Sequence, residues 1–254
     1  MGDSTIETTA AGSSVIGRAA AVLRVVGEDG GASLERICEG SGLSSSTAHR
    51  ILMSLVAQGF VVPAARGSYM IGPALLRLAG AMSARDLLIA VTRPRLRRLA
   101  RACRAHAHLG IFETDMVTYL VRIAFGRRKL FSVEGMQLEA YCSALGKVLL
   151  AGLPEEQRER YLAAGPFVPL TANTITDASA LRDELEGVRE CGFALDNEEI
   201  LPGLKCLAVP VRDAGGRVHA AISISAAAGA PPFGALADRV GDLQQVADEI
   251  AALC

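Results

Sequence analysis

The sequence lacks the features that would place a chain in a membrane or outside a reducing compartment. No uncharged apolar run reaches the roughly 18 residues that a membrane-spanning helix needs, so we expect no membrane span. No apolar signal segment precedes the six cysteines, which form neither a CxxC pair nor a regular spacing. We therefore expect the protein to act in the cytoplasm.

Acidic residues are absent from Gly40 through Arg85, a stretch that holds four arginines. A second run without acids extends from Arg93 to Arg104, and most of the carboxylates follow Glu113. The formal net charge of -1 and the pI near 6.4 therefore conceal a basic N-terminal part and an acidic C-terminal part. This asymmetry favours a nucleic-acid partner for the N-terminal part.

Residues 43–60 have the pattern of one amphipathic helix with a start signal, two faces and a stop. Ser44 is placed to cap the first backbone N–H groups, and Gly59 can adopt the left-handed turn that ends a helix. The apolar positions have the spacing of a buried stripe: Ala48, Ile51, Leu52 and Leu55. The other face carries Ser46, His49, Arg50 and Met53. Such a face can donate hydrogen bonds to phosphates or base edges, which is typical of a recognition helix.

The preceding elements complete a helix-turn-helix pattern. One helix begins at Ser13 or Ser14 and ends at Gly27, and the next is capped by Ser33 and ends in a glycine turn at residues 40–42. In this arrangement the second helix of the pair enters the major groove of DNA. The alternative for residues 43–60 is a surface helix with a solvated arginine, and the order of elements favours DNA binding.

Two short β-rich runs, at residues 60–62 and 69–71, predict a hairpin, or wing, after the recognition helix. Arg66 lies at its tip, where a side chain can reach phosphate or the minor groove, the alternative being a solvated hairpin arginine. Pro73 then opens a further amphipathic helix, which we expect to continue as a linker toward Arg85.

The C-terminal half has the pattern of an α+β domain, and a length of 254 residues with 50% hydrophobic content suits two domains with separate cores. The predicted strands are residues 108–112, 117–121, 129–133, 204–211 and 218–225. The predicted helices are residues 144–151, 154–163, 178–191 and 235–253. Short turns join the first two and the last two strands, so we expect a mainly antiparallel sheet flanked by helices.

A candidate ligand site lies on the last two strands. Ser223 and Ser225 alternate with isoleucines, so both hydroxyls fall on one face of an otherwise apolar strand, and Cys206 lies on the strand expected beside it. A small ligand with a carboxylate or carbonyl would satisfy them, assisted by backbone N–H groups where Leu145 and Gly146 open a helix. The alternative is that these hydroxyls bond to the backbone or face solvent.

Catalytic and metal functions have weaker support. Cys206, His219 and Asp196 can be imagined as nucleophile, base and orienting group, yet no nucleophile elbow or glycine-rich loop supports them. Lys147 follows Gly146 as in a phosphate loop, but the full spacing is absent. A structural role is favoured over metal binding for three residues that lie close in sequence: Cys103, His106 and His108. We therefore predict no enzyme, no catalytic residues, no metal and no cofactor.

The chain resembles the IclR family of bacterial transcriptional regulators over nearly its whole length. The N-terminal match is residues 43–52, followed by Gly59-Phe60 and by residues 69–72. The C-terminal match is residues 143–151, 188–194, 198–199, 203–211 and 222–225, in family order and with family spacing. Where the family often has Pro-Lys, this chain has Ser44-Ser45, so we expect its operator preference to differ from that of its relatives.

The resemblance implies a fold, partners and site residues. We expect a winged helix-turn-helix at residues 13–78, a linker helix at 79–92 and a GAF-like effector-binding domain at 93–254, in a homodimer or dimer of dimers that binds a partly palindromic DNA operator. The DNA-binding residues would be Ser44, Ser45, Ser46, Thr47, His49, Arg50 and Arg66. By position, the family's effector pocket maps to Leu130, Leu138, Ala144, Leu145, Asp196, Leu204, Cys206, Ser223 and Ser225, with Gly146 beside them.

The implied function is a transcriptional regulator that responds to a small organic acid or a phenolic or other aromatic effector. An enzyme or sensor domain that uses Cys206 and Asp196 without transcriptional output is the alternative.

Overall fold

The computed structural model describes residues 14–28, 30–81, 83–126, 131–229 and 238–253, and divides the chain into two compact units, Met1–Ser83 and Ala84–Cys254. This division differs from the predicted one, which placed a linker helix at residues 79–92. Helix α5 (Ala84–Cys103) runs unbroken through that boundary. Leu88 packs in the same apolar core as Leu96 and Leu99, so residues 84–92 belong to the second unit.

The first unit is the predicted winged helix-turn-helix. Its helices are α1 (Val15–Glu28), α2 (Leu34–Ser41), α3 (Ser45–Ala57) and α4 (Pro73–Gly80). The wing consists of β2 (Val61–Pro63) and β3 (Ser68–Ile71), and the short β1 (Ala32–Ser33) pairs with the free edge of β3 to give the order β1-β3-β2. Apolar side chains from α1, α2 and α3 form one core together with Val61 of the wing.

Local sequence signals set most of the helix boundaries in this unit. Ser33 Oγ accepts a hydrogen bond from the Arg36 N–H at 3.3 Å, as predicted for a cap of α2, and Gly42 adopts the left-handed conformation (φ 65°) that the turn into α3 needs. The predicted side-chain cap of α3 is wrong. Ser44 Oγ donates to Thr47 Oγ1 at 3.0 Å and accepts no hydrogen bond from a backbone N–H of the helix.

The second unit is built on a six-stranded sheet with the order β6-β5-β4-β9-β8-β7. Every neighbouring pair is antiparallel, which confirms the predicted sheet type. The strands are β4 (His106–Glu113), β5 (Met116–Ile123), β6 (Gln137–Glu139), β7 (Ala194–Asn197), β8 (Leu204–Arg212) and β9 (Val218–Ala227). The strand predicted at 129–133 is wrong in its described part, since residues 131–133 form no strand and β6 pairs with β5 in its place.

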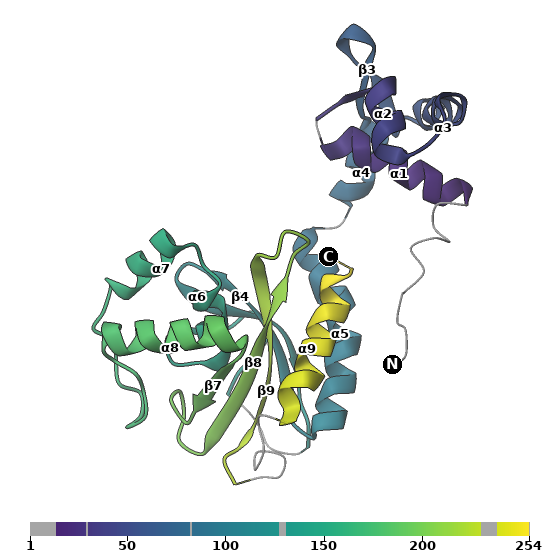
Figure 1. Cartoon of the computed structure of the whole chain (residues 1–254). Coiled ribbons are helices and arrows are strands. Elements are labelled where there is room, and N and C mark those ends of the chain that lie inside the picture. Colours follow the sequence, from purple (N-terminus) through teal and green to yellow (C-terminus); the bar gives the residue numbers. More distant parts are fainter. Residues whose placement is uncertain (1–13, 29, 82, 127–130, 230–237, 254) are drawn as a thin grey trace, which may run out of the picture. The chain divides into compact units, whose positions relative to one another are not determined.

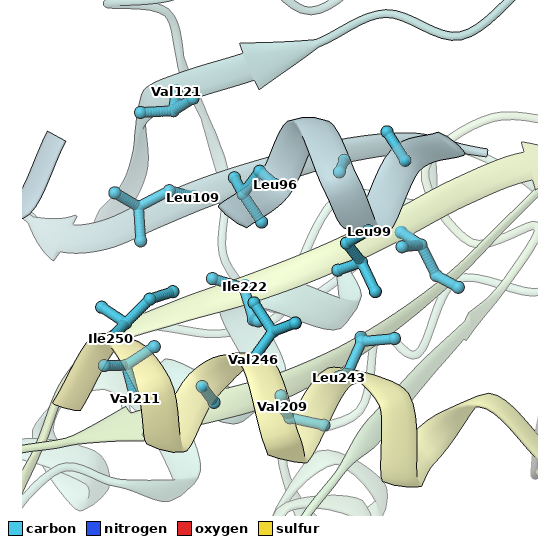
Figure 2. Packing of buried hydrophobic residues seen from close by; sticks show 14 of the residues in the cluster. Leu96, Leu99, Leu109, Val121, Val209, Val211, Ile222, Leu243, Val246 and Ile250 are labelled. Carbon is cyan, nitrogen blue, oxygen red and sulfur yellow. The ribbon is translucent and has the colours of Figure 1, made fainter. Parts of the chain in front are cut away.

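Helices cover both faces of this sheet. Figure 1 shows α5 and α9 (Val240–Ala251) on one face, and α6 (Ala144–Ala151), α7 (Glu155–Leu162) and α8 (Ala178–Cys191) toward the other. Leu96, Val209, Ile222 and Val246 are among the side chains that fill the core beneath α5 and α9 (Figure 2). None of the helices in the described part of the chain is long and apolar enough to cross a membrane.

Candidate functional sites

The outer face of α3 is the candidate recognition surface of the first unit. The predicted buried stripe is confirmed, because Ala48, Ile51, Leu52 and Leu55 are the residues of α3 that are buried. The predicted DNA-contacting side chains lie on the solvent side: Ser44, Ser45, Ser46, His49 and Arg50 are exposed, and Thr47 is half-buried. Met53 was expected on the exposed face but packs partly against the core. Among the described residues, no carboxylate forms an ion pair with Arg50.

The tip of the wing holds Arg66 in an exposed position. The turn between β2 and β3 is a short 3-10 segment (Ala65–Gly67), closed by a hydrogen bond from the Ala64 N–H to the Ser68 carbonyl at 2.8 Å. Arg66 itself has left-handed backbone angles (φ 58°, ψ 32°), which are uncommon for a residue with a side chain. The side chain is fully available to a phosphate group, and its contact with DNA stays a prediction.

The second unit contains a small cavity between the sheet and the start of α6. Its lining comes from strands far apart in the sequence, and the register explains why: Cys206 lies opposite both Asp196 and Ser225, and His108 lies opposite Ser223. Cross-strand partners point to the same face of a sheet. The full lining is His108, Tyr119, Phe131, Ser132, Ser143, Ala144, Leu145, Asp196, Ile200, Leu204, Cys206, Ser223 and Ser225.

Most of the predicted effector residues meet at this cavity. Ala144, Leu145, Asp196, Leu204, Cys206, Ser223 and Ser225 all line it. Leu138 does not line it, because it lies on the edge strand β6 and packs partly against the core around α6. Gly146 does not line it either: its Cα packs against the Ala140 backbone, and its N–H donates to Ser143 Oγ at 3.1 Å. Leu130 lies outside the described residues.

Six lining residues escaped the prediction: His108, Tyr119, Phe131, Ser132, Ser143 and Ile200. In the sequence, His106 and His108 alternate on one face of a strand, a pattern that favours a structural role over metal binding and does not indicate a ligand cavity. His108 lies opposite Ser223 because β4 pairs with β9. This pairing follows from the strand order, which is not a local property of the sequence. Ile200 and Phe131 come from loops whose course the sequence pattern does not give.

Asp196 is buried at one end of the cavity, with a relative exposure of 1%. Its Oδ1 accepts a hydrogen bond from the Glu199 N–H at 2.7 Å, and its Oδ2 has no partner among the described residues. Burial, with a smaller contribution from the nearby Glu199 carboxylate, raises the pKa of Asp196 to about 6. Next to it, Ser225 Oγ donates to Cys206 Sγ at 3.1 Å.

His108 is buried in the same cavity and is 3% exposed. Its Nε2 lies 3.2 Å from Ser132 Oγ, and its Nδ1 has no partner among the described residues. The ring packs edge-on against Tyr119, with 5.3 Å between the ring centres. Burial, and then the neighbouring His106 and Arg122, lower the pKa of His108 to about 3, so the imidazole is neutral at physiological pH.

Lys147 lies on α6 close behind the cavity and is held by two carboxylates. Its Nζ is 2.8 Å from Glu184 Oε1 on α8 and 2.8 Å from Glu199 Oε1, and the side chain is 1% exposed. The Glu199 backbone in turn holds Asp196. Because both ion pairs occupy the ammonium group, Lys147 has a structural role, which agrees with the rejection of a phosphate loop.

The geometry gives no support to the enzyme alternative. His219 is six residues along β9 from Ser225, the cross-strand partner of Cys206, which is a separation of roughly 20 Å at about 3.3 Å per residue. Burial raises the pKa of the Cys206 thiol well above its usual range, so a nucleophilic thiolate is disfavoured. Cys103 packs in the core under α5, on the other face of the sheet from His108, and the described residues hold no cluster of three metal-ligand side chains.

Comparison with known proteins places both units in one family. The family model for the IclR helix-turn-helix domain matches residues 15–64, and that for the bacterial transcriptional regulator IclR C-terminal domain matches residues 80–252. The chain is 38% identical to an HTH-type transcriptional regulator of Mycobacterium tuberculosis over 81% of this chain and 80% of the relative. It is 33% identical to HTH-type transcriptional regulator BhcR of Paracoccus denitrificans, over 82% and 75% of the two chains.

Solved structures give the same result. An IclR homolog from Microbacterium hydrocarbonoxydans, solved in complex with 4-hydroxybenzoate, is 27% identical, with a TM-score of 0.63 over 94% of this chain and 98% of that one. The relatives named above are transcriptional regulators, which confirms the prediction that the chain is not an enzyme. With DNA-binding and C-terminal domains both matched in the expected order, the chain belongs to the IclR family of bacterial transcriptional regulators.

Proposed function

We propose that the chain is a ligand-responsive regulator, which binds a partly palindromic operator and responds to a small organic acid or aromatic effector in the cavity of its second unit. The observation that carries the proposal is a cavity with buried, incompletely paired polar groups: Asp196 Oδ2 and His108 Nδ1. Buried polar atoms without partners are costly, and a polar ligand would supply the missing hydrogen bonds.

A carboxylate fits the end of this cavity that α6 provides. Ala144 and Leu145 line it at the first turn of the helix, where backbone N–H groups have no partner within the helix. Such N–H groups and the helix dipole favour an anion. The Microbacterium hydrocarbonoxydans relative was solved with 4-hydroxybenzoate, an aromatic acid. The cavity of this chain has a volume of about 20 Å³, so a ligand of that size requires lining side chains to move.

Exposed apolar side chains in the first unit support a dimer. Val15 and Ile16 on α1 are 70% and 82% exposed, and Leu76 and Leu78 on α4 are 65% and 63% exposed. Apolar groups of this kind mark an interaction surface. A homodimer would present two copies of α3 to two half-sites of a palindromic operator in the cytoplasm, and a dimer of dimers would present four.

Any coupling between effector binding and operator binding must be reciprocal. An effector that changes operator affinity by a given factor must have its own affinity changed by the operator through the same factor.

The double substitution Ser223→Ala with Ser225→Ala tests the proposal. A duplex is first selected from random DNA with the wild-type protein, and gel-shift affinities are measured with and without 4-hydroxybenzoate and a panel of other small acids. We expect the variant to bind the duplex like the wild type and to lose its response to the acid. Ser179→Ala, outside the cavity, serves as the control.

A double variant that keeps the full response would contradict the assignment of the site. If DNA binding and response are lost together, circular dichroism will show whether the variant is misfolded. If no acid in the panel changes the wild-type affinity, the proposed effector class is wrong.

A further inference from the structure

A short segment before β6, residues 131–136, closes one side of the cavity and is called the strap below. Phe131 and Ser132 line the cavity, and Ser132 Oγ lies 3.2 Å from His108 Nε2. Ser132 is buried, whereas Phe131 and Val133 are 42% and 56% exposed. The strap therefore covers the cavity with its inner side, while its outer side faces solvent.

A tight turn fixes the C-terminal end of the strap. The Met136 N–H donates to the Val133 carbonyl at 3.2 Å, and Gly135 has the left-handed backbone (φ 84°) that such a turn needs. The Gly135 N–H donates to the Tyr119 carbonyl at 2.8 Å, and the Tyr119 N–H donates to the Met136 carbonyl at 3.0 Å. These bonds attach the turn to β5 and place Glu134 at its tip.

An ion pair joins the strap to α5, which packs on the other face of the sheet. Arg93 donates two hydrogen bonds to the Glu134 carboxylate, at 2.7 and 2.9 Å, in a bidentate arrangement. Glu134 also accepts a hydrogen bond from the Arg122 N–H at 2.9 Å. The hydrogen bond from Arg93 lowers the pKa of Glu134, so the carboxylate is ionised at neutral pH. The strap is thus held to the cavity by Ser132 and to α5 by Glu134.

The strap is the most weakly held of the described sides of the cavity. The cavity has a volume of about 20 Å³, little more than one water molecule needs, so a ligand must displace part of the lining. The strands are bonded to their neighbours, and all eight residues of α6 are buried. The tie between the strap and α5, in contrast, joins side chains that are 31% and 40% exposed. Exposed ion pairs add little stability, so we expect the strap to move first.

We propose that the strap is the gate of the cavity and that the Arg93–Glu134 ion pair is its latch. The inference rests on the proposed effector function of the cavity, although its test requires no effector. Opening breaks the ion pair and separates Ser132 from His108, while the turn at Gly135 stays on β5. Opening also removes a contact of α5, the helix with which the second unit begins.

Alkylation of Cys206 in the full chain tests the proposal. Cys206 lines the cavity, and iodoacetamide is too large to enter while the gate is closed. The labelling rate at fixed pH, measured by mass spectrometry after digestion, therefore reports the open fraction of the gate. Cys103, in the core under α5, is 1% exposed and reports global unfolding in the same sample.

Two substitutions remove the latch: Arg93→Met and Glu134→Gln. Each should raise the Cys206 labelling rate about two- to fivefold and leave the rate of the core thiol unchanged. The two substitutions combined should do no more than either alone, since both remove the same ion pair. Arg182→Met is the matched control, because it breaks another bidentate ion pair of the second unit, of similar exposure and away from the cavity.

Salt gives a second measurement on the wild type. Raising sodium chloride from about 0.05 M to about 1 M screens the latch, so the Cys206 rate should rise about twofold relative to that of Cys103. Glu134→Gln should show no such rise. Arg93→Lys is a milder variant in case Arg93→Met does not fold. It keeps the charge but not the bidentate geometry, so its labelling rate should be intermediate.

A Cys206 rate that neither the latch variants nor salt changes overturns the proposal. An equal increase in Arg182→Met also overturns it, as does a parallel increase at Cys103, which would show that the whole unit loosens. Each of these results leaves the cavity standing as the effector site. A wild type that responds to no small acid would instead contradict the proposed function and leave the labelling result unchanged.

Discussion

In the first unit the described core consists of apolar side chains, whereas the second unit buries twelve polar or charged side chains among its described residues. The first unit carries its chemistry outside, on α3 and the wing, where Arg50 and Arg66 are solvated. The second unit has its polar and charged candidate residues in the interior. Asp196, His108 and Lys147 are buried there between strands and helices from distant parts of the chain. Substitutions at the exposed positions of α3 and the wing should therefore change stability little, whereas substitutions of the buried charged residues of the second unit should change it more.

The largest effect that this contrast predicts is at Lys147. Lys147→Met leaves Glu199 as a buried carboxylate without its cation, because Glu199 is only 6% exposed. Removing one partner of a buried ion pair costs about 3–5 kcal/mol of unfolding free energy. The measurement is urea unfolding followed by near-UV circular dichroism, to which Tyr119, Tyr141 and Tyr161 of the second unit contribute.

Two controls belong to this experiment. Glu184→Gln removes the more exposed partner of Lys147 and should cost about 1 kcal/mol or less. Arg24→Met, an exposed cation of α1, should change stability by about 0.5 kcal/mol or less. A loss at Lys147 no larger than in the controls would show that the buried ion pair does not distinguish the two units.

Arg50→Ala should affect DNA binding and not stability. We expect a loss of about 1–3 kcal/mol in operator affinity, or roughly tenfold to more than a hundredfold, if Arg50 contacts a base edge. A smaller loss, uniform over operator sequences, is expected if it contacts phosphate. Gel-shift titrations at fixed salt measure both, with Arg189→Ala in the second unit as control. Unchanged affinity would show that Arg50 does not contact the operator.

A pair of glycines sharpens the comparison within the second unit. A Cβ on Gly146 would lie 2.0 Å from the Ala140 carbonyl oxygen, so Gly146→Ala should lose about 1–3 kcal/mol of stability as α6 moves away. Gly187, inside the exposed side of α8, has no atom within 4 Å of such a Cβ. Gly187→Ala should therefore gain about 0.5–1 kcal/mol from helix propensity. Thermal melts of both variants give the sign, and equal signs would contradict the packing described for α6.

The smallest effect concerns pH. The pKa of His108 is lowered to about 3, so the stability contributed by the neutral ring is present above pH 6.5 and is lost as pH falls toward 3. The pKa of Asp196 is raised to about 6, so its contribution is present below about pH 4 and is lost as pH rises toward 6. Between these values the two effects oppose each other.

Single variants separate the two contributions. Compared with the wild type, His108→Phe should lose less melting temperature between pH 6.5 and pH 4, by several degrees. Asp196→Asn should become more stable relative to the wild type as pH rises from 4 to 6. His49→Phe on the exposed face of α3 is the matched control. Parallel melting curves for all of these proteins would rule out both buried groups as sources of pH dependence.

The same contrast explains how much the sequence could predict. The buried stripe of α3 was predicted residue by residue, because helix periodicity and the flanking glycines are local signals. The failures in the first unit are equally local, as with Ser44, whose hydroxyl bonds to Thr47. In the second unit the strands on either side of the two hairpins were predicted, and the antiparallel sheet with them.

The cavity could be predicted only in part, since it forms where strands meet that are distant in sequence. Ser223 and Ser225 were found through alternation on a single strand. His108 reaches the cavity because β4 pairs with β9. Ile200 reaches it on a loop in which the preceding residue, Glu199, is bonded to Lys147 and Thr171. The family resemblance supplied Asp196, whose buried environment no local pattern indicates.

The two walls of the cavity in the second unit differ in how firmly they are held. Helix α6 forms one wall and the sheet forms the other. All eight residues of α6 are buried, and the helix is fixed by the Ser143 cap, by the contact of Gly146 with Ala140 and by the ion pairs of Lys147. The sheet wall opposite presents Cys206, Ser223 and Ser225, which carry fewer structural bonds. Substitutions at Cys206, Ser223 and Ser225 should therefore disturb the fold less than substitutions in α6, so the lining of the cavity can vary on the strands while the helix is kept.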